Sequence, residues 1–134
     1  MSQTIEQLFS RQFQQASEAF NKYSTSIASA GIATFSCTSG NIHYITSTVS
    51  GNWTANLTNV GVTSGYCANY TLVIIQGTTA YIPTGLQIGG VSQTINWQGG
   101  SQPSGNNSKK DVIAYTVFDD AGTYTVYAQL VTFG

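Results

Sequence analysis

Charged side chains are scarce in this 134-residue chain. Asp, Glu, Lys and Arg make up only 7 % of it, against roughly 25 % in an ordinary soluble domain. None of them lies between Lys22 and Lys109, and the formal net charge is −1. Nucleic-acid binding needs clustered Lys or Arg, and the pair Lys109-Lys110 is too small a cluster. We therefore expect no nucleic-acid partner.

Long apolar runs are also missing. No segment offers the roughly 18 apolar residues of a membrane span. The opening residues, MSQTIEQLFSRQ, lack the basic end and apolar core of a signal peptide. We therefore expect neither membrane insertion nor secretion.

Cysteine and histidine are too few to build a metal centre. A site made of Cys37, His43 and Cys67 would lack a fourth ligand and any familiar spacing. We expect no metal and no cofactor. Two isolated cysteines without a secretion signal are most often reduced, so free thiols are favoured over a disulfide.

Catalytic groups are equally few. His43 could be oriented by Asp111, Asp119 or Asp120, but no G-x-S-x-G motif marks a nucleophilic serine. Adjacent Asp119 and Asp120 suit a turn better than the two facing carboxyls of a glycosidase. We expect that the chain is not an enzyme, although a pocket joining His43 to Asp111 or Asp120 would reopen the question.

Apolar residues at helical spacing form the first clear pattern in the sequence. They predict an amphipathic helix over residues 4–24, followed by a small-residue linker to residue 30. We interpret this N-terminal part, residues 1–30, as an attachment or oligomerisation element. Its assembly stripe contains Ile5, Leu8, Phe9, Phe13 and Phe20.

From residue 31 the pattern changes to short alternating strands rich in Thr, Val, Tyr and Ile. Turn signals separate them, including Gly89-Gly90 and the hairpin sequence at 119–122. We expect residues 31–134 to form one mainly β domain, an antiparallel β-sandwich of jelly-roll type. The predicted strand segments are 32–38, 41–49, 52–60, 66–76, 81–97 (two short strands), 111–118 and 123–133.

Two groups of apolar residues in the β domain are candidates for contacts outside the core. The consecutive run Val73, Ile74 and Ile75 predicts a strand covered on both faces, and a neighbouring subunit could cover the outer one. Trp53 and Trp97, with eight tyrosines, are suited either to stacking on a glycan or to the core and subunit interfaces.

The segment from Phe35 to Gly134 contains a combination of motifs that resembles a known domain. The motifs are T-x-x-Y-I-P at 78–83, Q-T-I-x-W-Q-G-G-x-x-P-S-G-N at 93–106, D-V-I-x-Y-T-V at 111–117 and the final Phe133-Gly134. Together they resemble a β domain of virion structural and tail-fibre-like proteins of marine tailed phages, of the cyanophage type. The resemblance covers about three quarters of the chain and supplies no catalytic or ligand residues.

The resemblance implies a phage virion structural protein on the particle exterior, made in the bacterial host cytoplasm. A small capsid decoration protein or a short fibre is the favoured role, with a tail-fibre module that recognises a cell-surface glycan as the alternative. We expect a homo-oligomer, and the resemblance favours a trimer. The other expected partners are virion proteins, such as the major capsid protein or a tail component.

The shortage of ionisable groups predicts that stability depends little on pH or salt, because few protons are linked to folding and few charges are screened. Melting temperatures measured between pH 5 and 8, and between low and high salt, should agree within about 8 °C, equivalent to roughly 1–2 kcal/mol. Larger shifts would reveal a buried charge or a bound ion.

Overall fold

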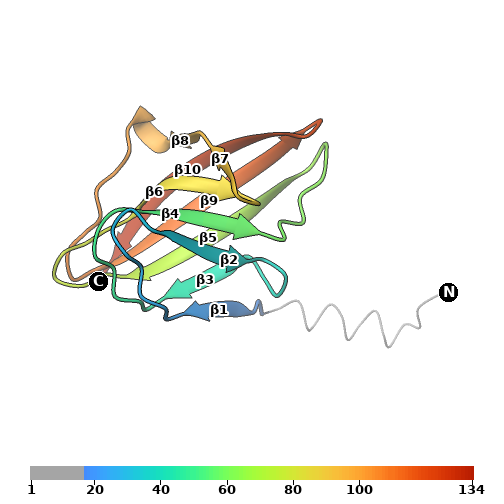
Figure 1. Ribbon diagram of the computed structural model, residues 1–134. Helices are drawn as coiled ribbons and strands as arrows, with labels where there is room; N and C mark the ends of the chain where they lie inside the picture. Colours follow the sequence, from blue (N-terminus) through green and yellow to red (C-terminus); the bar gives the residue numbers. More distant parts are fainter. Residues whose placement is uncertain (1–16) are drawn as a thin grey trace.

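The computed structural model describes residues 17–134, which form two β-sheets lying one in front of the other (Figure 1). The six-stranded sheet contains, in spatial order, β1 (Phe20–Tyr23), β3 (Ile42–Ile45), β5 (Cys67–Ile75), β9 (Lys110–Asp120), β10 (Thr123–Phe133) and β8 (Ile95–Trp97). The four-stranded sheet contains β2 (Ile32–Ser36), β4 (Trp53–Thr58), β6 (Pro83–Ile88) and β7 (Val91–Gln93). A short 3₁₀ turn, η1, covers Gln98–Gly100. Between residues 17 and 134 no helix is both long and apolar enough to cross a membrane.

The chain winds from one sheet to the other through its first six strands. Odd-numbered strands enter the larger sheet and even-numbered strands the smaller one, so successive windings stack in parallel: β1 on β3, β3 on β5, β2 on β4, and β4 on β6. Antiparallel pairing is confined to β5–β9, β9–β10 and β6–β7. The mainly β fold is confirmed, but the expectation of antiparallel, jelly-roll-type sheets was wrong. Alternation along a strand fixes which face is buried and carries no information about the direction of its neighbour.

The predicted N-terminal helix does not extend through its last residues. Phe20–Tyr23 form strand β1, which pairs along its length with β3. Ile27 is buried in the core and bridges to Val49, so the described part of the predicted N-terminal element belongs to the sheet structure. The stripe residues Ile5, Leu8, Phe9 and Phe13 lie outside the described residues.

Both predicted two-residue turns are present. Ala121 and Gly122 connect β9 to β10 with φ of 52° and 89°, and Gly89 and Gly90 connect β6 to β7 with φ of 58° and 82°. Two consecutive positive φ angles define the type I′ turn, whose twist matches that of a hairpin. The turn residues thus set the register of both hairpins.

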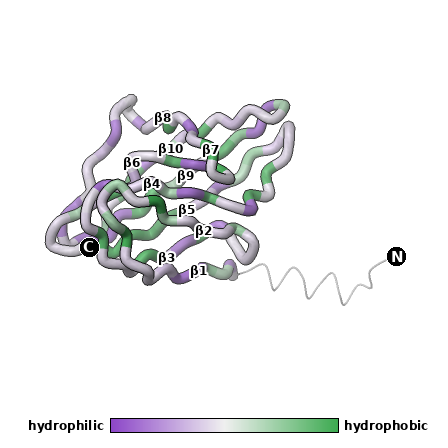
Figure 2. Tube along the Cα trace, in the orientation of Figure 1, coloured by the Kyte–Doolittle hydropathy of each residue, from purple (hydrophilic) through white to green (hydrophobic). Residues whose placement is uncertain are grey.

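The core contains side chains from both sheets, and Figure 2 shows hydrophobic positions interspersed along the strands. In β5, Tyr70, Leu72 and Ile74 are buried. Val73 and Ile75 point to the outer face and are half-buried. The apolar run 73–75 therefore has one residue in the core and two on the outer face of the sheet.

One buried carboxylate lies at the end of the fold where β9 begins and β10 ends, and it joins the neighbouring segments by hydrogen bonds. Asp111 is fully buried. Its Oδ2 accepts from Gln76 Nε2 (3.0 Å) and from the Asn106 backbone N–H (2.8 Å). Its Oδ1 accepts from Asn106 Nδ2 (2.8 Å) and Thr132 Oγ1 (2.9 Å). Four uncharged donors thus replace the water that this carboxylate lost on burial.

Truncation of this carboxylate should be strongly destabilising. Asp111→Ala leaves four donors without their acceptor, and we expect a loss of about 3 kcal/mol or more in the free energy of unfolding. Urea denaturation at fixed protein concentration measures it. Asp120→Ala removes an exposed carboxylate nine positions along the same strand and should change stability by about 0.5 kcal/mol or less. Equal effects of the two variants would show that the Asp111 cluster does not stabilise the fold.

Candidate functional site

The two sheets present outer faces of opposite character. On the four-stranded sheet the outer residues are mainly hydroxyls and amides, including the cross-strand row Thr34, Asn56, Gln87 and Ser92, with Ile32 as an exposed apolar exception. Asn56 donates from Nδ2 to Thr34 Oγ1 (3.3 Å) and accepts from the Gly90 N–H (2.9 Å). This face is polar without being charged, and it suits contact with water.

The outer face of the six-stranded sheet carries several large apolar side chains among uncharged polar ones. One row across four strands consists of Tyr44, Val73, Val112 and Val131, which are partners in register; we call it the outer row. Val131 is 44 % exposed. Other large apolar side chains on the same face are also exposed, namely Phe20, Phe118, Tyr127 and Phe133. Uncharged polar side chains lie on this face between the outer row and Phe118, namely Thr71, Gln129, Asn69 and Thr116. The face thus combines exposed apolar and aromatic side chains with uncharged polar ones, a composition typical of subunit interfaces.

Charge on this face lies at its margins. Alternation in β9 places Lys110 and Asp120 on the outer face at opposite ends of the strand, and both are exposed. Lys22 lies on the edge strand β1. Between Lys110 and Asp120 the outer residues of β9 are Val112, Ala114, Thr116 and Phe118. The centre of the face therefore carries no charge.

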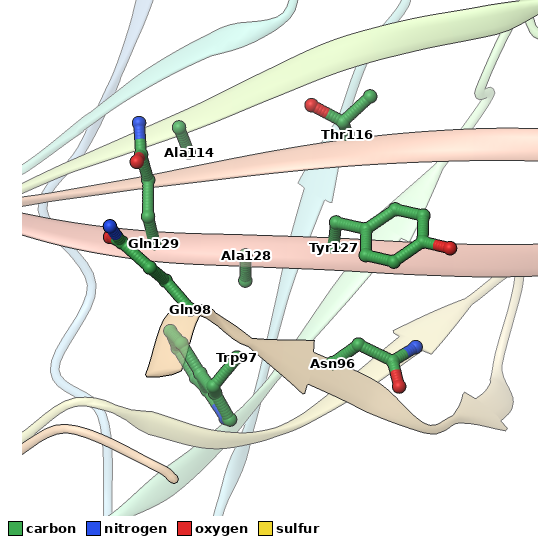
Figure 3. Close-up of a pocket in the computed structure, with 8 residues that line it drawn as sticks. All are labelled: Asn96, Trp97, Gln98, Ala114, Thr116, Tyr127, Ala128 and Gln129. Carbon is green, nitrogen blue, oxygen red and sulfur yellow. The ribbon is translucent and has the colours of Figure 1, made fainter. Parts of the chain in front are cut away.

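A shallow groove of about 480 Å³ lies over β8, β9 and β10 (Figure 3). Its lining is small, aromatic or amide: Asn96, Trp97, Gln98, Ala114, Thr116, Tyr127, Ala128 and Gln129. The Tyr127 ring, 53 % exposed, lies toward one end and the amides of Gln98 and Gln129 toward the other. Tyr127 also lines a second groove of about 470 Å³ with Tyr66, Cys67 and Phe118.

The two tryptophans have different environments. Trp97 is half-buried, lines the groove and packs on Tyr115 with ring centroids 6.5 Å apart. Trp53 is only 1 % exposed and packs on Phe35 in the core, with ring centroids 5.9 Å apart. Of the environments that the sequence left open, Trp53 occupies the core, so it does not stack on a glycan.

The candidate metal and catalytic residues are not brought together. Cys37 Sγ lies 3.7 Å from His43 Nε2 in the core, while Cys67 is exposed, and both thiols are free. No group of three metal-ligating side chains occurs within residues 17–134. Asp111 is engaged by its own four donors, and Asp119 Oδ1 accepts from the Gly122 N–H in the turn (2.8 Å). No hydrogen bond in the described residues joins His43 to an aspartate.

Burial shifts the pKa of both Cys37 and His43. Loss of water raises the pKa of the Cys37 thiol to about 11, because the thiolate is poorly solvated in the core. The same cause lowers the pKa of His43 from its ordinary value of 6.5. At neutral pH the pair is therefore an uncharged thiol beside an uncharged imidazole, which is suited to packing.

Sequence reasoning recognised only part of the outer row. It singled out Val73 through an apolar run on consecutive residues, and the same signal is present in β9, where Val112, Ile113, Ala114 and Tyr115 follow one another. A strand apolar on consecutive positions has both faces apolar, in β9 as in β5. The apolar face could thus have been extended from β5 to β9.

Comparisons of the chain with protein-family models, curated proteins and solved structures find no match.

Burial of His43 predicts a loss of stability on the acid side. The unfolded chain takes up this proton near pH 6.5 while the folded chain resists it, so stability falls as pH drops from 7 to 5. Each pH unit below 6.5 contributes at most about 1.4 kcal/mol, so the loss by pH 5 is at most about 2 kcal/mol, the upper limit of the small pH dependence expected from the sequence. His43→Leu should flatten this dependence, measured as the difference in melting temperature between pH 7 and pH 5. An unchanged pH dependence in the variant would assign the acid loss to another group.

Proposed function

We propose that the chain is a bacteriophage virion structural protein, a small capsid decoration protein or short fibre on the particle exterior. The observation that supports it best is the contrast between its two outer faces. One has several exposed aromatic and aliphatic side chains around an uncharged centre, and the other is mainly hydroxyls and amides. A building block of a particle needs one face to bury and one to expose.

The physical chemistry of subunit interfaces supports this choice. Interface cores are depleted of charge and enriched in aromatic residues, as the outer face of the six-stranded sheet is with Phe118, Tyr127 and Phe133. Hydroxyl and amide side chains also form intersubunit hydrogen bonds without the desolvation cost of ions. The partners proposed on this basis are other copies of the chain and a major capsid protein or tail component.

The N-terminal residues are the proposed attachment element. The stripe of Ile5, Leu8, Phe9 and Phe13 is too apolar to remain in water, and the described β structure has its own core without it. Removal of residues 1–24 would also delete strand β1, which pairs with β3. The informative truncation therefore ends at residue 16.

A second candidate function is a receptor-binding module that recognises a cell-surface glycan. The groove beside Tyr127 favours it, because an exposed aromatic ring at one end suits stacking on a sugar, and the Gln98 and Gln129 amides at the other end suit hydrogen bonding to its hydroxyls. This candidate uses the same sheet face as assembly does, so the two can be distinguished experimentally.

Deletion of residues 1–16 should leave a folded β domain that no longer joins the particle. Tagged full-length and truncated chains would be produced in infected host cells, and their presence on purified particles measured by immunoblot and electron microscopy. Circular dichroism and melting temperature provide the folding control. Normal incorporation of the truncated chain would remove the attachment role, and absence of the full-length chain from particles would overturn the virion proposal.

A further inference from the structure

We propose that a second copy of this chain covers the outer face of the six-stranded sheet. The two copies are related by a two-fold axis that lies in the plane between the two sheets and runs perpendicular to the strands. The strand β9 of one copy therefore lies antiparallel over β9 of the other. This inference rests on the proposed assembly function and specifies its first partner.

The size of the face matches what a stable contact between two copies needs. The three central strands, β5, β9 and β10, are spaced about 4.8 Å apart and extend up to about 37 Å, which gives a footprint on the order of 500 Å². Side chains standing off the sheet, together with β3 and β8, enlarge the accessible area. Stable interfaces bury about 800 Å² per partner, so one sheet face is of the required scale.

The charges at the margins determine whether the strands of the second copy run parallel or antiparallel to those of the first. Lys110 and Asp120 occupy the two ends of β9 on this face. When two β9 strands cross antiparallel, each Lys110 lies at the level of the other copy's Asp120, and both pairs attract. A two-fold or three-fold axis along the strands would instead place each Lys110 at the level of another Lys110. The resemblance alone favours three subunits, but this charge arrangement favours two.

The same geometry places uncharged groups opposite one another and covers the most apolar of them. Tyr115 is the midpoint of the eleven-residue β9, so the axis passes over it and residues equally distant on either side are exchanged. Val112 then lies over the other copy's Phe118, and Ala114 over Thr116. The register of β10 likewise places Val131 over Thr125, and Gln129 over Tyr127. The exposed Phe118 ring is covered by the outer row without any charge entering the centre.

The mass of the purified protein in solution is the first test. Light scattering at micromolar concentration should give twice the 14.2 kDa chain mass. Val112→Asp, which places a charge in the centre of the face, should give a monomer. Thr34→Asp, which places the same charge on the polar face of the other sheet, should leave the dimer intact. Circular dichroism confirms that both variants fold.

Exchanging the charges of Lys110 and Asp120 tests whether the two copies are antiparallel. Lys110→Glu and Asp120→Lys should each weaken dimerisation about three- to thirtyfold, because each creates two like-charged pairs. The double variant K110E/D120K should restore wild-type affinity, since the opposite charges again face one another. Analytical ultracentrifugation at low salt measures the dissociation constants. Additive losses in the double variant would overturn the antiparallel arrangement.

Other outcomes overturn the inference while leaving the proposed function intact. A wild-type monomer or trimer excludes the two-fold pairing, and either can still be incorporated into particles. A monomer that binds neutral glycans on an array, and loses that binding in Tyr127→Ala, would assign the face to a glycan. Failure of incorporation with a normal dimer would instead refute the virion role alone.

Discussion

The packing at one end of the fold depends on the hydrogen bonds that satisfy the buried carboxylate of Asp111. This carboxylate receives hydrogen bonds from residues 35, 21 and 5 positions away in the sequence, on the segment after β5, the end of β10 and the loop before β9. A buried carboxylate without these donors would be strongly unfavourable, so the three segments must converge wherever Asp111 is buried. Gln76 extends the network, because it also donates to the Tyr81 carbonyl and accepts from the Tyr81 N–H. The loop that follows η1 is fixed to both long strands in this way.

With that end fixed, the long strands β9 and β10 form a continuous surface. Eleven cross-strand pairs without a register shift keep the same set of side chains on one face from end to end. The parallel windings supply β3 and β5 on one side of the hairpin, and the short β8 completes the other. Because β5 and β9 are apolar on consecutive residues, filling the core leaves a second apolar surface outside. The outer row thus lies on the same strands as the core, on the residues that alternate with the buried ones.

Local features of this fold could be predicted from the sequence, whereas its long-range features could not. The Ala121-Gly122 and Gly89-Gly90 turns follow from residue type, because glycine tolerates the positive φ of a type I′ turn. Strand positions follow from alternation, as in the inward-facing Tyr70, Leu72 and Ile74. The helical spacing through Phe20 was misleading, because pairing with β3 overrides a local periodicity in so short a segment. The Asp111 cluster joins distant residues of ordinary type, so the sequence offered Asp111 only as one conceivable partner for His43 in a disfavoured catalytic arrangement, and gave no sign of its structural role.

Because charged residues are scarce in this chain, each of the few that are present has a large effect on the electrostatics of the surface. In a domain with a mixed ionic surface, a pair such as Lys110 and Asp120 would be screened and compensated by neighbours. Here the strand between them presents only uncharged groups to the outside, so these two residues and Lys22 on the edge strand β1 are the charges of this face. Apolar contact supplies the affinity but is non-directional, and it would permit several angles between two sheets. The placement of one positive and one negative group at equal distances from the strand centre makes one direction preferable to the others. The same uncharged centre keeps the groove beside Tyr127 suited to a neutral glycan, and a molecule using its face for one partner cannot offer it to the other.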